Sequence, residues 1–211
     1  MRRYRNIIFD LGGVILHIDY ARTIAAFKKL GIENFDKIYS QKQQTGLFDE
    51  LEKGLIGADV FREALLHHLP AGTTHAQVDA AWNAMLLDFP AENLAFLSRL
   101  RSECRLFLLS NTNEIHLKEV MRILQRSHGF GDLALFFERA YYSHRLGMRK
   151  PDAEIFRHVL GHNKLHPSET LFIDDSPQHV KGAQALGIEA RLTEKNKLLN
   201  DPEGPLKEFL S

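Results

Sequence analysis

Four short stretches rich in apolar residues do most to limit what this 211-residue chain can fold into. We interpret all four as strands covered on both faces, because their apolar residues do not alternate with polar residues. Segments with helical spacing and helix-capping residues lie between them, so strands and helices alternate. The sequence therefore predicts an α/β fold with a doubly wound, Rossmann-like parallel sheet. The stretches are residues 6–9, 105–109, 170–173 and 188–191.

Residues 17–91 depart from this alternation. Apolar side chains recur there at helical spacing, as in Ile24, Phe27 and Leu30, and no segment has a convincing strand pattern. Pro90 marks the return to the sheet-forming part of the chain. We therefore predict an α/β core made of residues 1–16 and 92–211, with a small helical cap domain, residues 17–91, inserted after the first strand.

Composition excludes several classes of partner. The 27 Lys and Arg residues equal the 27 Asp and Glu residues, and no long block has one sign, so bulk charge predicts no binding to nucleic acid or to a membrane surface. The lone cysteine, Cys104, cannot form an intramolecular disulfide, which favours a reducing compartment. No apolar stretch reaches the roughly twenty residues that span a bilayer. We expect a cytoplasmic protein with no membrane partner.

Polar side chains follow the predicted strands directly. In an open parallel sheet, ligands bind beyond the carboxyl ends of the strands, so these residues are the first candidates for a functional site. Each one alone is also typical of an ordinary turn or helix cap. Together they predict one site, formed by Asp10 after the first strand, Ser110 and Asn111 after the second, Lys150 after a strand-like segment at 140–143, and Asp174 and Asp175 after the fourth.

The charges of these residues indicate their chemistry. Three carboxylates and one ammonium leave an excess of negative charge, which a hard divalent cation such as Mg²⁺ would neutralise through oxygen ligands. A bound cation would also let a phosphate approach and leave one carboxylate free to attack phosphorus. Lys150 and the N–H groups of the loop 110–112, before a helix predicted to start near Asn113, would hold the phosphate oxygens.

The same segments, in this order, resemble the four motifs of the haloacid dehalogenase-like hydrolase superfamily, and the resemblance covers essentially the whole chain. The helical insert is similar to the small cap domain of that family, which selects substrate. The residues around Ser110 and Lys150 look most like the branch that contains a glucose 1-phosphate phosphatase and the amino-terminal phosphatase domain of mammalian soluble epoxide hydrolase. The motifs are matched by Asp10-Leu11-Gly12-Gly13-Val14, by Ser110, by Lys150-Pro151 and by Asp174-Asp175.

The resemblance implies a role for each residue. Asp10 would be the nucleophile that forms an aspartyl-phosphate, Ser110 and Asn111 would bind the transferring phosphoryl group, and Lys150 would orient Asp10. Of the acidic pair, Asp175 is favoured as the direct metal ligand, and Asp174 is expected near Lys150 or the metal. The resemblance assigns Mg²⁺ to Asp10, the carbonyl of Gly12, Asp174 and Asp175, and we choose Phe48 and Trp82 as cap residues that contact the substrate.

Gly12 departs from the family pattern. Most phosphatases of this type carry a second Asp there, as general acid and base, and positioned proton transfer is worth roughly 10²- to 10⁴-fold. Either another group, such as His17 or Asp19, replaces it, or the substrate has a leaving group that needs less protonation. A sugar 1-phosphate fits the second case, so we expect a small phosphorylated substrate of that kind.

Two other functions are compatible with these motifs. The loss of the second Asp could leave a phosphate-binding or regulatory protein without catalysis. The superfamily also contains 2-haloacid dehalogenases, although the pair Asp174-Asp175 argues against that branch, because dehalogenation has no use for the metal. His179, in the helix after this pair, falls where relatives often carry Asp or Asn, which allows a role behind the metal site.

Overall fold

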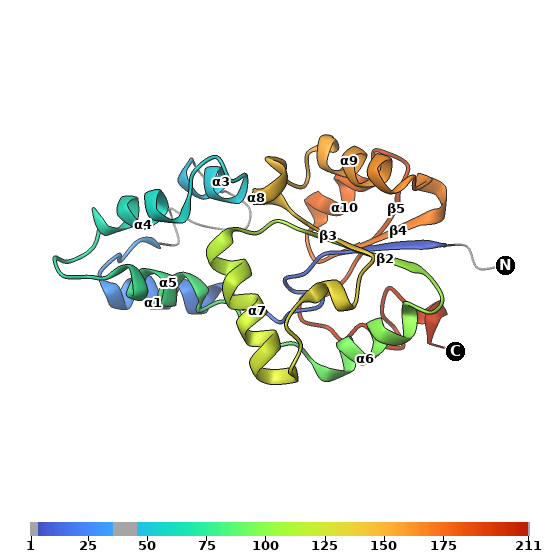
Figure 1. Ribbon diagram of the computed structural model, residues 1–211, viewed down its shortest axis with the longest axis horizontal. Helices are drawn as coiled ribbons and strands as arrows, with labels where there is room; N and C mark the ends of the chain where they lie inside the picture. The colour runs from blue at the N-terminus through green and yellow to red at the C-terminus, as the bar shows by residue number, and fades with distance from the viewer. Residues whose placement is uncertain (1–3, 36–45, 211) are drawn as a thin grey trace.

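The computed structural model describes residues 4–35 and 46–210. Within these residues, five parallel strands form one sheet in the order β3-β2-β1-β4-β5, which confirms the predicted α/β fold (Figure 1). The strand-like segment near residue 140 is the additional strand, at one edge of the sheet. The strands are β1 (Asn6–Phe9), β2 (Arg105–Ser110), β3 (Arg139–Tyr142), β4 (Thr170–Asp174) and β5 (Glu189–Leu192).

Helices cover both faces of the sheet. Ile7 and Phe9 of β1 belong to a hydrophobic cluster with α6 and α7, whereas Ile8 belongs to a second cluster with α9 and α10. This alternation explains the apolar sequence of β1, because successive side chains point to opposite faces and both faces are covered. The core helices are α6 (Ala91–Leu100), α7 (Glu114–His128), α8 (Ser143–Leu146), α9 (Ala153–Asn163) and α10 (Pro177–Gln184), with short 3-10 helices at Leu133–Leu135, Pro167–Glu169 and Lys207–Phe209.

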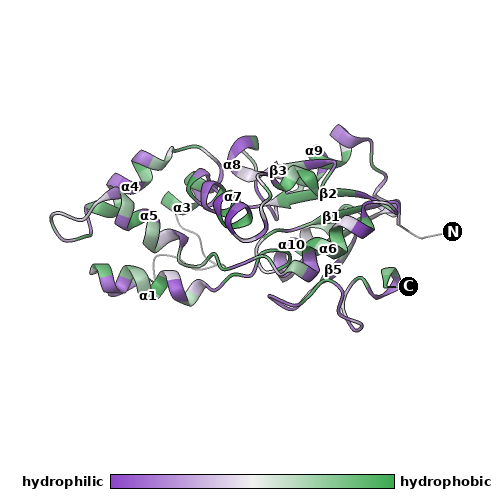
Figure 2. Cartoon of the chain, turned by 60° about the horizontal axis from the view of Figure 1, so that its bottom comes forward, coloured by the Kyte–Doolittle hydropathy of each residue, from purple (hydrophilic) through white to green (hydrophobic). Residues whose placement is uncertain are grey.

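The edge strand β5 differs from the prediction. We expected full coverage on both faces, but Glu189 and Arg191 are only partly buried and Leu192 is exposed, while Ala190 between Glu189 and Arg191 is buried. An edge strand has one neighbour and incomplete cover, so its residues alternate. The central strands β1 and β4 are buried throughout. Figure 2 shows that the hydropathy of the residues follows this burial, with the hydrophobic strands lying between helices of mixed hydropathy.

The described helices between residues 20 and 83 form a group beyond the carboxyl ends of the strands (Figure 1). These helices share a hydrophobic cluster of their own, which Ile115 from the first turn of α7 joins. The division into two domains at residues 16/17 and 91/92 remains a prediction. The helices of this group, called the cap below, are α1 (Tyr20–Leu30), α3 (Leu47–Glu52), α4 (Ala58–Leu66) and α5 (His75–Asn83).

Two short segments connect the cap to the core, and they pair with each other. Ile18 forms an antiparallel bridge with Leu86. The N–H of His17 donates to the carbonyl of Asp88 at 2.9 Å, and the N–H of Leu87 donates to the carbonyl of His17 at 3.0 Å. The side chain of Asn196 accepts from the N–H of Ile18 and donates to its carbonyl, each at 2.9 Å. The loop after β5 therefore holds the start of the cap in place.

Phe48 and Trp82 lie in the interior of the cap, which corrects our prediction that they contact the substrate. They are 2% and 1% exposed, and their rings pack at 5.4 Å from each other. Trp82 also stacks on His116 of α7, with ring centroids 4.6 Å apart. Trp82 falls at helical spacing with Val78 and Met85, which is the pattern of a core-facing stripe, and here the stripe marks the core of the cap.

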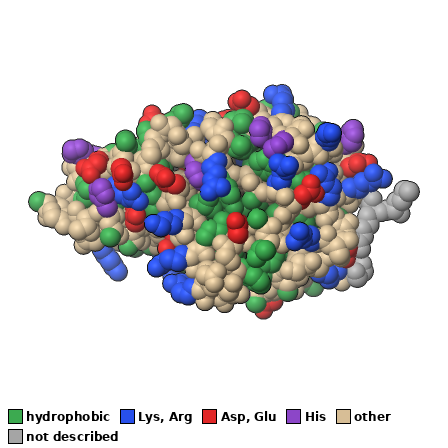
Figure 3. Space-filling model, in the orientation of Figure 1, with side chains coloured by type: hydrophobic (Ala, Val, Ile, Leu, Met, Phe, Trp, Pro, Cys, Tyr) green, Lys and Arg blue, Asp and Glu red, His purple; other side chains and the backbone are tan. Residues whose placement is uncertain are grey.

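The surface has no dominant charge of one sign in the view of Figure 3, where Lys and Arg side chains are interspersed with Asp and Glu. Among the described residues, no helix combines the length and the apolar composition that crossing a membrane requires.

The buried ring of His116 should make the stability of the fold sensitive to acid. Burial lowers the pKa of His116 to about 3, against 6.5 for an ordinary His, so this ring stays neutral in the folded protein while the unfolded chain takes up a proton. The free energy of unfolding should therefore fall by about 1.4 kcal/mol per pH unit from this group as the pH drops below 6.5 towards 3.

Urea unfolding at a series of pH values tests this prediction. His116→Phe keeps an aromatic ring against Trp82 and removes the titration, so the acid side of its stability curve should be flatter. His68→Phe, at an exposed position, is the matched control and should keep the wild-type slope. Parallel curves for His116→Phe and wild type would contradict the prediction.

Candidate active site

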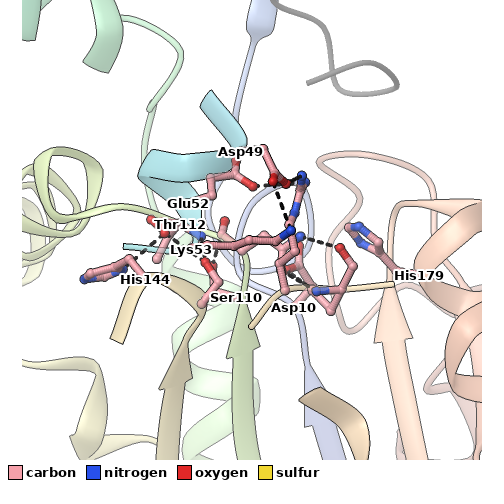
Figure 4. Close-up of polar contacts among 12 residues, drawn as sticks. Asp10, Asp49, Glu52, Lys53, Ser110, Thr112, His144 and His179 are labelled. Carbon is pink, nitrogen blue, oxygen red and sulfur yellow. Dashed lines mark hydrogen bonds and ion pairs between the residues drawn. The ribbon is translucent and has the colours of Figure 1, made fainter. Parts of the chain in front are cut away.

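The carboxyl ends of the central strands bring the predicted site residues together (Figure 4). Asp10 directly follows β1, and its N–H donates to the carbonyl of Ile173 in β4 at 2.9 Å. Ser110 is the last residue of β2, and Asp174 is the last residue of β4. All three side chains are buried. The sheet thus places a carboxylate, a hydroxyl and a second carboxylate at adjacent strand ends.

Lys150 links two of the carboxylates. Its Nζ is 2.5 Å from Oδ1 of Asp10 and 2.7 Å from Oδ2 of Asp174, and the residue is 0% exposed. Burial alone would lower the pKa of Lys150, but Asp10 and Asp174 outweigh it and raise that pKa. Lys150 is therefore a fixed positive charge in contact with the predicted nucleophile.

The Asn111 side chain holds the main chain of Lys150. Its Oδ1 accepts from the N–H of Lys150 at 2.9 Å, and its Nδ2 donates to the carbonyl of Lys150 at 2.8 Å. The peptide bond that follows, Lys150-Pro151, is cis. The Asn111 side chain thus positions the main chain of Lys150. A contact of Asn111 with a phosphate stays a prediction.

The two oxygens of Asp174 accept from protein donors. Besides Lys150 on Oδ2, the N–H of Ser176 donates to Oδ1 at 2.8 Å, and Nδ1 of His179 lies 3.0 Å from Oδ1. Burial would raise the pKa of Asp174, but Lys150 and His179 outweigh it and hold that pKa below its usual value. Asp174 thus makes the expected contact with Lys150, and His179 lies behind it.

Asp175 has the properties of a metal ligand. Its Oδ2 is buried and has no hydrogen-bond partner among the described residues, and Nζ of Lys195 is 3.9 Å away. Burial, with the charges of Asp10 and Asp174, raises the pKa of Asp175 to about 7. A buried carboxylate oxygen that accepts no hydrogen bond and has only a distant ammonium beside it fits a cation that would offset the clustered charge.

The surroundings of Asp175 support the same assignment. Asp10, Asp174 and Asp175 each offer an oxygen, and these atoms all lie within 4.8 Å of one another. Burial and the charge of Asp174 also raise the pKa of Asp10, against the opposite effect of Lys150. A Cβ on Gly13 would lie 2.5 Å from Oδ2 of Asp175, so glycine at this position leaves room for the carboxylate. These residues fit Mg²⁺, which prefers carboxylate oxygens.

The loop after β2 is only partly available for a phosphate. The N–H of Thr112 donates to Oγ of Ser143 at 2.9 Å, and the same Oγ donates to the carbonyl of Thr112 at 2.9 Å. This N–H is therefore engaged inside the protein, contrary to our prediction for the loop 110–112. Oγ of Ser110 is 3.5 Å from the carbonyl of Asn111, a weak contact that leaves the hydroxyl able to serve a ligand.

The two predicted substitutes for the missing acid lie at the start of the cap. Oδ1 of Asp19 accepts from the N–H of Ala21 at 2.9 Å and caps α1. Nδ1 of His17 is 3.6 Å from Oδ1 of Asp88, in the paired segments that connect cap and core. These contacts give both residues a structural role.

Sequence reasoning missed a contact between cap and core beside Lys150. Nη1 of Arg149 donates to Oδ1 of Asp49 at 2.7 Å, and Nη2 of Arg149 is 3.0 Å from Oε2 of Glu52. Both carboxylates belong to α3. The sequence does show two acidic residues, Asp49 and Glu52, at i, i+3 spacing in a helical segment, and a cation, Arg149, next to Lys150. No sequence pattern indicates that these residues contact each other.

Comparisons with known proteins identify the family of this chain. A family model described as haloacid dehalogenase-like hydrolase matches residues 4–187. D-ribitol-5-phosphate phosphatase of Bacteroides thetaiotaomicron is 35% identical over 185 residues, which are 88% of this chain and 89% of that protein.

Solved structures of this family are also similar to the chain. A HAD family enzyme of Bacteroides thetaiotaomicron, an Asp-to-Ala mutant in complex with magnesium and inorganic phosphate, has a TM-score of 0.87 and 37% identity, covering 92% of this chain and 96% of that chain. A predicted HAD-like family hydrolase from Porphyromonas gingivalis has a TM-score of 0.83 and 35% identity, covering 93% and 94%.

More distant structures share the fold alone. An L-2-haloacid dehalogenase from Xanthobacter autotrophicus has a TM-score of 0.61 at 19% identity, covering 90% of this chain and 77% of that chain. The family model and the relatives above 30% identity cover most of the sequence. The chain therefore belongs to the haloacid dehalogenase-like hydrolases and is an enzyme of that family.

Proposed function

We propose that this enzyme is a Mg²⁺-dependent phosphatase that hydrolyses a small organic phosphate monoester through an aspartyl-phosphate on Asp10. The observation that carries the proposal is the position of Lys150, whose Nζ lies 2.5 Å from Asp10 and 2.7 Å from Asp174. An ammonium that fixes one oxygen of a carboxylate leaves the other oxygen to attack phosphorus. The buried oxygen of Asp175, which accepts no hydrogen bond from the described residues, supports a metal at the same site.

The chain's own residues account for the two displacements. Asp10 would attack phosphorus as the bond from phosphorus to the leaving oxygen breaks, and that oxygen would take a proton from solvent. Water would then hydrolyse the aspartyl-phosphate. Lys150 and the hydroxyl of Ser110 would stabilise the charge on the phosphoryl oxygens. Asp10, Asp175 and the carbonyl of Gly12 would hold Mg²⁺, which neutralises negative charge between phosphate and carboxylates. Asp174 supports Lys150 and adds to the negative charge that attracts the cation.

Two substrate classes follow from independent arguments. The 35% identity to D-ribitol-5-phosphate phosphatase, over 88% of this chain, favours a polyol phosphate. Gly12 at the place of the usual acid favours a sugar 1-phosphate, because an anomeric oxygen leaves more easily than an ordinary alcohol. Both are small phosphorylated carbohydrates, and we propose this as the substrate class.

Phosphate release from D-ribitol 5-phosphate and from glucose 1-phosphate tests the proposal directly. We expect steady release with Mg²⁺, loss of release with EDTA, and recovery when Mg²⁺ is returned in excess. The ratio of kcat/KM for the two substrates decides between the polyol and the sugar 1-phosphate. Full activity after metal removal, or no release from any phosphate in a wider panel, would show that the proposal is wrong.

Gly12→Asp tests the missing acid. A Cβ at Gly12 would lie 3.3 Å from Cδ1 of Ile18, so a side chain fits if Ile18 moves by a few tenths of an ångström. We expect the new carboxylate to raise kcat for D-ribitol 5-phosphate by roughly tenfold or more, because that leaving group needs a proton, and to change kcat for glucose 1-phosphate less.

The control for this variant is Gly12→Ala, which has the same contact with Ile18 but no carboxyl group, and Ile18→Val can be added to relieve the contact. An equal change for Gly12→Asp and Gly12→Ala on both substrates would show that proton donation from residue 12 is not limiting.

A further inference from the structure

We infer that Arg149 is a positioning residue that holds cap helix α3 over the active site and thereby sets which leaving groups the enzyme accepts. The inference deepens the proposed function, because it concerns the part of the substrate beyond the phosphate. It is carried by two independent features: the ion pairs of Arg149 with α3, and the close approach of Gly54 to the core.

The ion pairs join cap and core at the residue next to Lys150. Arg149 reaches Asp49 at 2.7 Å and Glu52 at 3.0 Å through its two terminal nitrogens. The side chains are largely removed from solvent, with Arg149 14% and Glu52 10% exposed. Attraction between partly buried charges is less screened than at the surface. The pKa of Asp49 reflects this, because burial would raise it but Arg149 and Lys53 hold it below its usual value.

Gly54, two residues after α3 ends, shows that the same face is closely docked. A Cβ on Gly54 would lie 2.1 Å from the carbonyl oxygen of His144 in the core, and the φ of Gly54 is +64°. Only glycine allows both the close approach and this backbone conformation. His144 in turn contacts the loop that follows β2 and Ser110, since its Nδ1 lies 3.1 Å from the carbonyl of Thr112.

Figure 4 shows where this docking places the cap. Asp49, Glu52 and Lys53 of the α3 segment lie above Asp10 and Ser110 in the view. Next to Arg149 in the chain, the main chain of Lys150 is held by Asn111, and its Nζ is held by Asp10 and Asp174. Arg149 thus extends from a rigid point of the core to α3. A substrate whose phosphate lies at Asp10 would have its leaving group on the side that α3 covers.

Arg149→Met tests the inference because it keeps length and removes both ion pairs. We expect kcat/KM for D-ribitol 5-phosphate to fall about tenfold or more, and kcat/KM for acetyl phosphate, which is too small to need α3, to fall less than about threefold. Asp49→Asn with Glu52→Gln should give the same selective loss. Combined with Arg149→Met, these changes should add little further, since all of them break the same contact.

Arg62→Met is the matched control. Arg62 also bridges two carboxylates, Asp59 and Asp79, each at 2.8 Å, and its side chain is 19% exposed, but both partners belong to the cap. This variant should keep the wild-type ratio of the two substrates. Gly54→Ala should reproduce the selective loss by a steric route, because the added methyl group cannot fit between α3 and His144.

Hydrogen exchange of the α3 segment, residues 46–54, gives a readout that needs no substrate. Exchange there should be faster in Arg149→Met and in Asp49→Asn/Glu52→Gln than in wild type and Arg62→Met. Unchanged exchange in Arg149→Met, or an equal loss of activity on both substrates, would overturn the inference. If wild-type enzyme releases no phosphate from any substrate, the proposed function is wrong, while the exchange experiment still decides whether Arg149 holds α3.

Discussion

Asp10→Asn is expected to reduce phosphate release by at least roughly 10⁴-fold while leaving the protein folded, because the amide cannot attack phosphorus. The substitution keeps the shape of the side chain, and its carbonyl oxygen can still accept from Lys150. Burial and the charge of Asp174 raise the pKa of Asp10, which means that the folded protein disfavours its charged form. Removing that charge should therefore not lower, and should raise, the melting temperature of the metal-free protein.

Activity assays with D-ribitol 5-phosphate and p-nitrophenyl phosphate, together with thermal unfolding, check this prediction. Asp132→Asn is a suitable control, since Asp132 is an exposed cap of a short 3-10 helix far from the nucleophile in sequence. Turnover within a hundredfold of wild type would exclude Asp10 as the nucleophile. A collapse of the melting temperature would mean that the loss of activity reflects unfolding.

Lys150→Met is expected to remove both activity and stability. The ammonium is fully buried between Asp10 and Asp174, so its loss leaves two buried carboxylates without the cation that they share. Breaking a buried ion pair in this way costs about 3–5 kcal/mol of unfolding free energy. We also expect a fall in kcat of roughly 10²- to 10³-fold, because a positive charge at the phosphoryl group is lost.

The response of the Lys150→Met variant to Mg²⁺ distinguishes the loss of a shared cation from a simple packing defect. Because bound Mg²⁺ would neutralise the same carboxylates, it should raise the melting temperature of Lys150→Met more than that of wild type. Lys28→Met, at a surface position paired with Glu33, should change stability by less than about 0.5 kcal/mol. A loss below about 1 kcal/mol for Lys150→Met, or equal responses to Mg²⁺, would contradict the prediction.

The sheet and the strand-end residues were predictable because local sequence carries their signal. β1 and β4 are buried on both faces, and that burial appears in the sequence as short apolar segments. Asp10 and Asp174 stand at the ends of these strands, where parallel strands bring their carboxyl ends to one edge. The predicted burial of β5 on both faces was wrong. This strand lies at the edge of the sheet, and its position is decided only when the whole sheet assembles.

The contacts that the sequence did not indicate join side chains to partners that are distant along the chain. Asn111 follows the second strand, and its side chain holds the main chain of Lys150, 39 residues away. Arg149 and Asp49 are 100 residues apart, and neither residue alone indicates a contact. Trp82 stands at the helical spacing of a core-facing stripe with Val78 and Met85, and the choice of Trp82 as a substrate contact went against that pattern.

Ile115 and His116 limit how freely the cap could be exchanged between relatives. Both residues lie in α7, outside the inserted segment, yet Ile115 belongs to the hydrophobic cluster of the cap and His116 stacks on Trp82. A chimera that transplants only residues 17–91 from another enzyme would leave a foreign core facing this turn of α7. Transplants of the cap should therefore succeed when the first turn of α7 is transferred with it. The unit that folds around the cap core is larger than the inserted segment.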